Sequence, residues 1–182
     1  MDKKSKFLLL QVNDALFPIG GYSHSYGLET YIQKELVTNA AEAEAYIRNK
    51  LTQNLLYNEL FFCRLAWERA QAQDMEGLQE LEEVLEAGKV PSEIREASKK
   101  MGSRFAKTLK NCGIVYETPV FLRYLEKKKS GSAHHVIAYG IFCSSIGISL
   151  EDCLEHFLYA QTSAMVTNCV KSIPLSQTTG QQ

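Results

Sequence analysis

Four histidines and five cysteines are the side chains of this 182-residue sequence best suited to bind a transition metal. Cys153 and His156 are three positions apart, a spacing that brings two side chains onto one face of a helix. The neighbours His134 and His135 point in different directions on a helix and do not form a clamp. Because small thiols on amphipathic helices commonly pack as core residues, we predict no metal centre here.

The cysteines also bear on the redox state of the chain. They are scattered without a CxxC pair, and their odd number argues against a complete disulfide framework. We therefore predict buried, reduced thiols at Cys63, Cys112, Cys143, Cys153 and Cys169.

The well-defined catalytic signatures are absent from the sequence. It contains no GxxxxGK[ST] nucleotide loop, no HExxH zinc motif and no GxSxG nucleophile elbow. We predict a protein that is not an enzyme and needs no cofactor. An all-α enzyme with a buried small-molecule pocket is an alternative, suggested only by glycine-rich and aromatic segments.

The composition excludes several partners. Twenty basic and 21 acidic residues give a formal charge of −1, so neither a nucleic-acid backbone nor an anionic membrane is an expected partner. The apolar run at residues 7–10 is too short to span a membrane and poorly shaped as a secretory signal. We expect a cytoplasmic protein.

Helical periodicity dominates the chain. The clearest helix is predicted from an N-cap at Thr38 to about Asp74, without an internal Gly or Pro. Gly, Pro and capping residues then separate further predicted helices, at about 75–87, 91–113, 119–129, 134–148 and 149–174. The segment 134–148 also has the composition of a strand, but the capped helical pattern after it favours a helix. We predict an all-α fold, a compact multi-helix bundle forming a single domain over residues 1–182.

Two irregular segments interrupt this pattern. The first, 17–29, combines Pro18 with three glycines, aromatic residues and hydroxyls, and the second, 171–181, combines Lys171 and Pro174 with a polar turn. Each is simply explained as a link between helices. His24, in the first, is suited to hydrogen-bonding backbone groups, contacting a partner or binding a metal.

These segments carry a resemblance to a known family. Residues 8–29 resemble the N-terminal signature of the UreF family of urease accessory proteins. The later signature of that family is similar to Lys171, Pro174-Leu175, Gln177 and Gly180-Gln181, and the family has a helix similar to the one at 160–163. Ser176 stands where many members have Gly, and members usually continue through further helices beyond residue 182. The resemblance therefore suggests a chain that lacks the C-terminal helices.

The resemblance implies an all-α homodimer that binds the accessory protein UreD, also called UreH, and the GTPase UreG, in a complex that acts on apo-urease. The implied role is a scaffold that directs nickel insertion, holding the GTPase near the urease active site and modulating GTP hydrolysis. An alternative is a metallochaperone that binds nickel directly through His24 and a second ligand.

The resemblance also implies the site residues. The motif positions are Gly20, Gly21, His24, Ser25, Gly27, Glu29, Lys171, Pro174, Gln177, Gly180 and Gln181. We expect His24, Ser25 and Glu29 near the path of the metal, and Lys171 and Gln177 in contact with the GTPase. The aromatic residues Tyr139, Phe157 and Tyr159 are candidates for a dimer or UreD interface, although helical spacing suits ordinary core positions as well.

Overall fold

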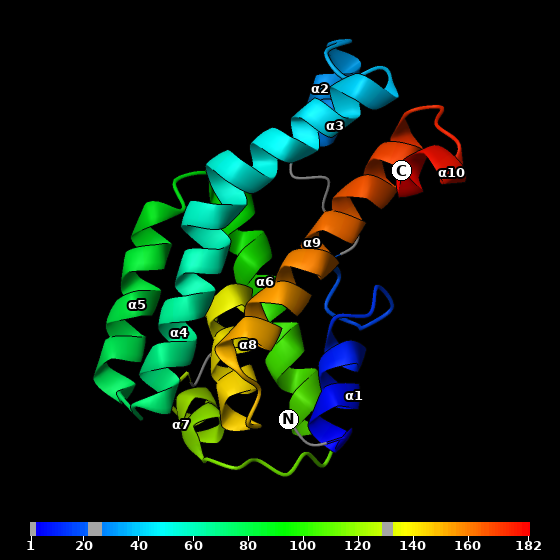
Figure 1. The fold of residues 1–182 in the computed structure, drawn as a ribbon. Coiled ribbons are helices and arrows are strands. Elements are labelled where there is room, and N and C mark those ends of the chain that lie inside the picture. Colours follow the sequence, from blue (N-terminus) through cyan, green and yellow to red (C-terminus); the bar gives the residue numbers. More distant parts are fainter. Residues whose placement is uncertain (1–2, 22–26, 129–132) are drawn as a thin grey trace.

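The computed structural model describes residues 3–21, 27–128 and 133–182. These residues form helices joined by short connections and contain no strand (Figure 1). The predicted all-α fold is confirmed. The helices are α1 (Lys3–Val12), α2 (Leu28–Gln33), α3 (Ala40–Asn49), the π-helix η2 (Lys50–Leu60), α4 (Phe61–Gln71), α5 (Met75–Gly88), α6 (Ser92–Lys110), α7 (Val120–Lys127), α8 (His135–Ser145), α9 (Leu150–Ser172) and α10 (Gln177–Gln181).

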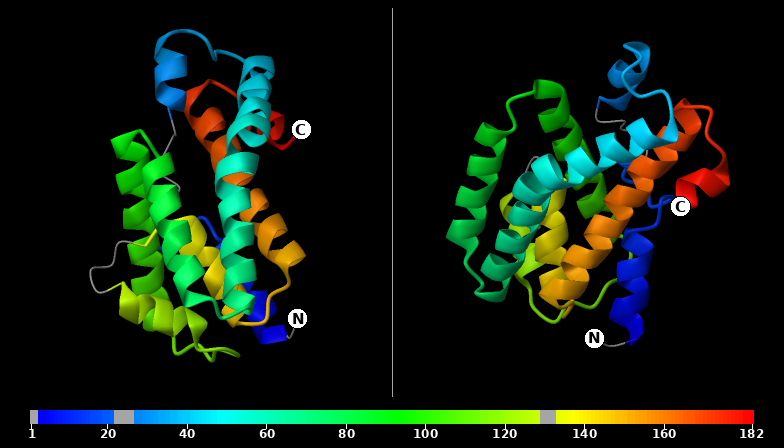
Figure 2. Two further views of the ribbon diagram at one scale, coloured as in Figure 1. Left: turned by 90° about the vertical axis from the view of Figure 1, so that its left-hand side faces the viewer. Right: turned by 45° about the horizontal axis from the view of Figure 1, so that its top comes forward.

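Helix α8 is the centre of the bundle. Every one of its residues is buried, and it packs against α4, α6, α7 and α9 (Figures 1 and 2). Gly140 allows the close contact with α4, because a Cβ at this position would lie 2.5 Å from the carbonyl oxygen of Cys63. A helix buried on all sides needs apolar residues throughout, which explains why this segment also had the composition of a strand.

Aromatic rings fill the core beside α8. The ring of Phe105, from α6, lies 5.5 Å from that of Phe142 and 6.0 Å from that of Phe17, centroid to centroid. Both contacts are edge-to-face, the arrangement that the ring quadrupole favours. Phe17 thereby anchors the chain that follows α1 to the main core.

The long helix predicted from Thr38 to Asp74 is continuous only from Ala40 to Gln71, and its middle third is the π-helix η2. Its N-cap is Asn39 rather than Thr38, because the Asn39 side chain accepts a hydrogen bond from the backbone of Glu42. The Glu42 carboxylate in turn accepts one from the Thr38 backbone at 2.7 Å, a capping-box arrangement. Asp74 lies beyond the helix and caps α5.

The remaining boundaries lie close to the predicted ones. Ser149 caps α9 by accepting a hydrogen bond from the Asp152 backbone at 3.1 Å, as its position before a periodic stretch predicted. Pro91 and Pro119 directly precede α6 and α7. Capping signals are local, which explains why the sequence placed them correctly.

A second, smaller hydrophobic cluster lies at the end of the molecule formed by α2, α3 and the C-terminal part of α9 (Figure 1). It consists of the buried residues Leu28, Val37, Ala43, Cys169 and Ile173. Within the described ranges, no helix combines the length and apolarity needed to cross a bilayer.

Candidate functional site: a contact surface formed by two sequence motifs

The small cluster joins the two irregular sequence segments. Leu28, next to Glu29 in the first segment, packs in the same cluster as Ile173, which belongs to the second. Leu175 adds a partly buried side chain to it. Segments at opposite ends of the chain therefore form one end of the folded molecule.

The second motif is a tight turn between two helices. Helix α9 ends at Ser172, and Ser176 caps α10 by accepting a hydrogen bond from the Thr179 backbone at 3.0 Å. Gly180 lets α10 pack on α9, since a Cβ there would lie 2.5 Å from Cγ2 of Val170. The turn leaves four predicted site residues exposed, namely Lys171, Pro174, Gln177 and Gln181.

The first motif reaches this end only through its last residues. Gly27 immediately precedes α2 with a φ of 94°, a left-handed conformation that suits glycine. Glu29 is exposed in the first turn of α2, where a carboxylate interacts favourably with the helix dipole. The predicted residues His24 and Ser25 lie outside the described residues. We define the motif surface as Glu29, Lys171, Pro174, Gln177 and Gln181.

The paired glycines of the first motif lie beside α6 instead. Gly20 has a φ of 78°, and Nη1 of Arg104 donates a hydrogen bond to the carbonyl of the preceding Ile19 at 3.4 Å. A Cβ at Gly21 would lie 3.4 Å from Sδ of Met101. These glycines position the chain against the bundle and are not part of the motif surface.

Two of the three predicted interface aromatics lie in the core. Tyr139 is 1% exposed and Phe157 is 2% exposed, so neither side chain is available to a second chain. The interface interpretation is corrected for both: their rings pack on each other, 5.1 Å apart between centroids. Tyr159, two residues further along α9, is 74% exposed and retains that interpretation.

Three of the side chains considered as metal ligands, those of His134, Cys153 and His156, make other contacts. Nδ1 of His156 lies 2.9 Å from the carbonyl oxygen of Asp152, whereas Sγ of Cys153 is buried 3.7 Å from Sγ of Cys63. The two nitrogens of His134 pair with Ser98 and Glu86. Among residues 3–21, 27–128 and 133–182, no group of three or more His, Cys, Asp or Glu side chains is arranged to hold a metal ion.

The five cysteines are free thiols, and one of them is not buried. Cys63, Cys143, Cys153 and Cys169 are buried, and burial raises the pKa of Cys143 well above its ordinary value. Cys112 is exposed, which corrects the prediction for that residue, because it lies in the turn that follows α6.

Comparison with known proteins gives the family. The family model described as UreF matches residues 37–182. Urease accessory protein UreF of Bacillus sp. (strain TB-90) is 34% identical over 96% of this chain and 76% of its own length. The proteins of the same name from Corynebacterium glutamicum (strain R) and Haemophilus influenzae (strain PittGG) are 33% and 36% identical, over 100% and 95% of this chain and 79% and 73% of their own lengths.

This chain belongs to the UreF family. The second motif lies within the range that the UreF model matches, and the alignment with the Corynebacterium relative extends over the first motif as well. The UreF name describes an accessory protein and not an enzyme, in agreement with the prediction from missing catalytic signatures.

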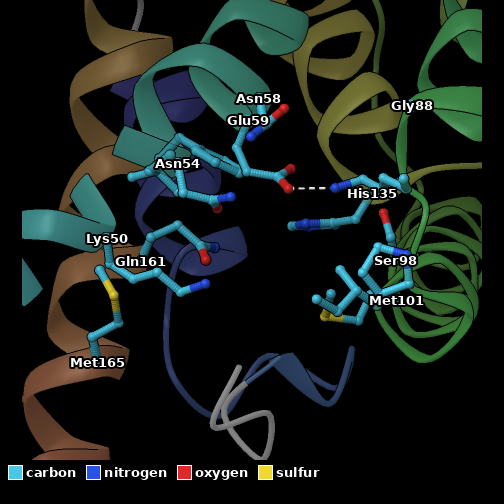
Figure 3. Close-up of a pocket in the computed structure, with 15 residues that line it drawn as sticks. Lys50, Asn54, Asn58, Glu59, Gly88, Ser98, Met101, His135, Gln161 and Met165 are labelled. Atoms are coloured by element: carbon cyan, nitrogen blue, oxygen red, sulfur yellow. Dashed lines mark hydrogen bonds and ion pairs between the residues drawn. The ribbon is translucent and has the colours of Figure 1, made fainter. Parts of the chain in front are cut away.

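The structure also contains a cavity that the sequence did not reveal. It measures about 160 Å³ and lies between η2, α6, α8 and α9 (Figure 3). A partly buried ion pair lies at its wall, where Nζ of Lys89 is 2.5 Å from Oε1 of Glu59. Lys50 and His135 also line it. No sequence motif connects these residues. If residues 50–60 are taken as an α-helix, Lys50 and Glu59 fall on opposite faces, so sequence analysis could not place them at one cavity.

Proposed function

We propose that this chain acts in urease maturation as a non-catalytic scaffold that joins UreD and UreG in a complex acting on apo-urease. The observation that supports the proposal is the meeting of the two UreF-like motifs on one buried cluster, with the motif surface above it. A contact surface requires fixed geometry, and the packing of Leu28 and Ile173 in one buried cluster supplies it.

The chemistry of the motif surface suits protein recognition. Lys171 offers a cation and Gln177 an amide that both donates and accepts hydrogen bonds, next to the rigid Pro174. We assign the contact with the GTPase to Lys171 and Gln177. Glu29 lies on the neighbouring α2, and with His24 and Ser25 it is assigned to the side nearer the path of nickel.

In this proposal the scaffold acts by position. It holds the nickel-carrying GTPase near the entrance of the urease active site and couples GTP hydrolysis to metal transfer, which is an energetic coupling between two binding sites. The proposal includes a homodimer in the cytoplasm. Tyr159 is the exposed aromatic candidate for its interface or for that with UreD.

Co-purification tests the partners directly. Tagged chain is expressed with UreD, UreG and urease, and we expect UreD and UreG to elute with it. The double variant Lys171→Ala with Gln177→Ala is expected to lose UreG and keep UreD. The matched control, Lys110→Ala with Asn111→Ala, changes an exposed Lys at the end of α6 and the exposed amide that follows it, and is expected to keep both UreG and UreD. Retention of UreG by the Lys171 and Gln177 variant would contradict the assignment of that surface.

A further inference from the structure

Several of the polar side chains that line the cavity beside η2 form no hydrogen bond within the part of the chain that the structure describes. Nε2 of His135 is buried without a hydrogen bond, and its ring faces the cavity (Figure 3). Lys50, Asn54 and Gln161 point toward the same space from η2 and α9. Because buried polar groups are normally hydrogen-bonded, the unpaired Nε2 of His135 is unusual, and the partly buried Lys50 and Gln161 and the exposed Asn54 place further polar groups beside it.

The π-helix is responsible for this grouping. In an α-helix, at ~100° per residue, positions nine apart lie on opposite faces. The i to i+5 hydrogen bonds of η2 give more residues per turn, so that Lys50, Asn54 and Glu59 all line the cavity. Single π-helical turns are frequent at functional sites, and here the wider turn directs charged groups inward.

The charged side chains that line the cavity favour a negatively charged ligand over a positively charged one. Glu59 pairs with Lys89 at 2.5 Å and also attracts the ammonium of Lys50, so two ammonium groups share one carboxylate and the three side chains carry a net positive charge. Burial lowers the pKa of Lys50, which means that its charge is poorly solvated there. Two ammonium groups disfavour a cation, whereas an anion would pair with Lys50 and accept hydrogen bonds from the amides and the imidazole.

The volume of the cavity and the apolar side chains that line it favour a small anion that carries an apolar group. A cavity of about 160 Å³ is smaller than the ~300 Å³ at which pockets for drug-sized ligands begin. Apolar side chains, including Met101, Phe157 and Met165, form much of its wall. We propose that this cavity binds a small carboxylate with a short apolar tail, held by Lys50, Asn54, Gln161 and His135.

An NMR titration of the purified full chain tests this binding. Sodium propionate is added against sodium chloride at constant ionic strength, and the ring resonances of His135 are followed. We expect saturable shifts with propionate. Sodium sulfate, a tetrahedral dianion without a tail, is expected to bind at least about tenfold more weakly. The absence of a saturable shift with propionate, or equal affinity for sulfate, would overturn the proposal.

Variants connect the binding to the named side chains. Lys50→Met removes the charge but keeps a long side chain, and it is expected to weaken propionate binding at least about tenfold. Gln161→Leu removes a hydrogen-bonding amide from the same cavity without changing its charge. If Lys50→Met does not fold, the propionate affinity of Gln161→Leu is compared with that of the unmodified chain instead. Lys110→Met, on the exposed end of α6, is the matched control and should bind as the unmodified chain does. Unchanged affinity in the folded cavity variants would contradict the assignment.

These measurements use the chain alone, without UreD, UreG or urease. Their failure would therefore leave the proposed scaffold function intact, and failure of the scaffold proposal would leave this site intact.

Discussion

Gly180 of α10 packs directly on Val170 of α9, so closely that a Cβ on the glycine would lie 2.5 Å from Cγ2 of the valine. The valine is β-branched and cannot move its methyl groups far, so any side chain at position 180 must displace α10. The docking of a five-residue helix, and with it part of the motif surface, therefore depends on the absence of a single side chain.

The Gly180→Val variant tests this dependence. None of the α10 residues is buried, so we expect little change in the thermal midpoint of the chain measured by circular dichroism. We expect affinity for the UreG-containing complex, measured by pull-down titration, to fall by about tenfold. Thr178→Val is the control, because residue 178 is exposed on the same helix. Full affinity in Gly180→Val would show that α10 does not contribute to the contact.

The central helix gives a prediction on stability. Gly140→Ala places a Cβ 2.5 Å from the carbonyl oxygen of Cys63, and α4 must shift to relieve the clash. We expect a loss of about 1–3 kcal/mol in the free energy of unfolding, measured by urea denaturation. Gly88→Ala is the matched control, since a Cβ there meets nothing within 4 Å. It should be neutral or stabilise α5 by up to about 1 kcal/mol.

The buried His135 predicts a loss of stability in acid. Burial lowers its pKa from 6.5 to about 4 in the folded chain, so the unfolded chain takes up a proton first as the pH falls. The free energy of unfolding is therefore not reduced by His135 above pH 6.5, and this residue reduces it progressively as the pH falls below 6.5. We expect about 2 kcal/mol to be lost through this residue between about pH 7.5 and about pH 5.

Urea denaturation of the His135→Phe variant at the two pH values measures this contribution. Its loss of stability in acid should be smaller than that of the unmodified chain by about 2 kcal/mol. The loss should not vanish, because burial also lowers the pKa of His134. Thr178→Val, at an exposed position on α10, is the control and should retain the full loss. An equal acid loss in His135→Phe and in the unmodified chain would contradict the assigned pKa.

Much of the helical fold follows from local signals in the sequence. The caps at Ser149 and Asn39 and the prolines before α6 and α7 act within one helical turn, so pattern analysis places these boundaries within a residue or two. The π-helix could not be predicted in this way. Residues 50–60 have a pattern that an α-helix also satisfies, and the wider turn depends on packing in the folded chain.

In the candidate site, too, local sequence signals predict some features whereas others depend on tertiary packing. The motifs name Glu29, Lys171 and Gln177, but the contact of Leu28 with the cluster around Ile173 is a tertiary contact that no spacing rule encodes. For aromatics on a helix, periodicity alone cannot separate a core position from an interface position. Tyr139 and Tyr159 had similar sequence arguments, yet one is buried and the other is exposed.

The nickel content of urease shows whether this chain acts in nickel insertion. Urease is expressed with its accessory proteins in three strains, which carry the unmodified chain, no chain, or the Lys171→Ala and Gln177→Ala variant, and is purified for metal analysis. We expect abundant but nickel-poor urease without the chain, and an intermediate or equally low nickel content with the variant. Fully nickel-loaded urease in the strain that lacks the chain would contradict the proposed function.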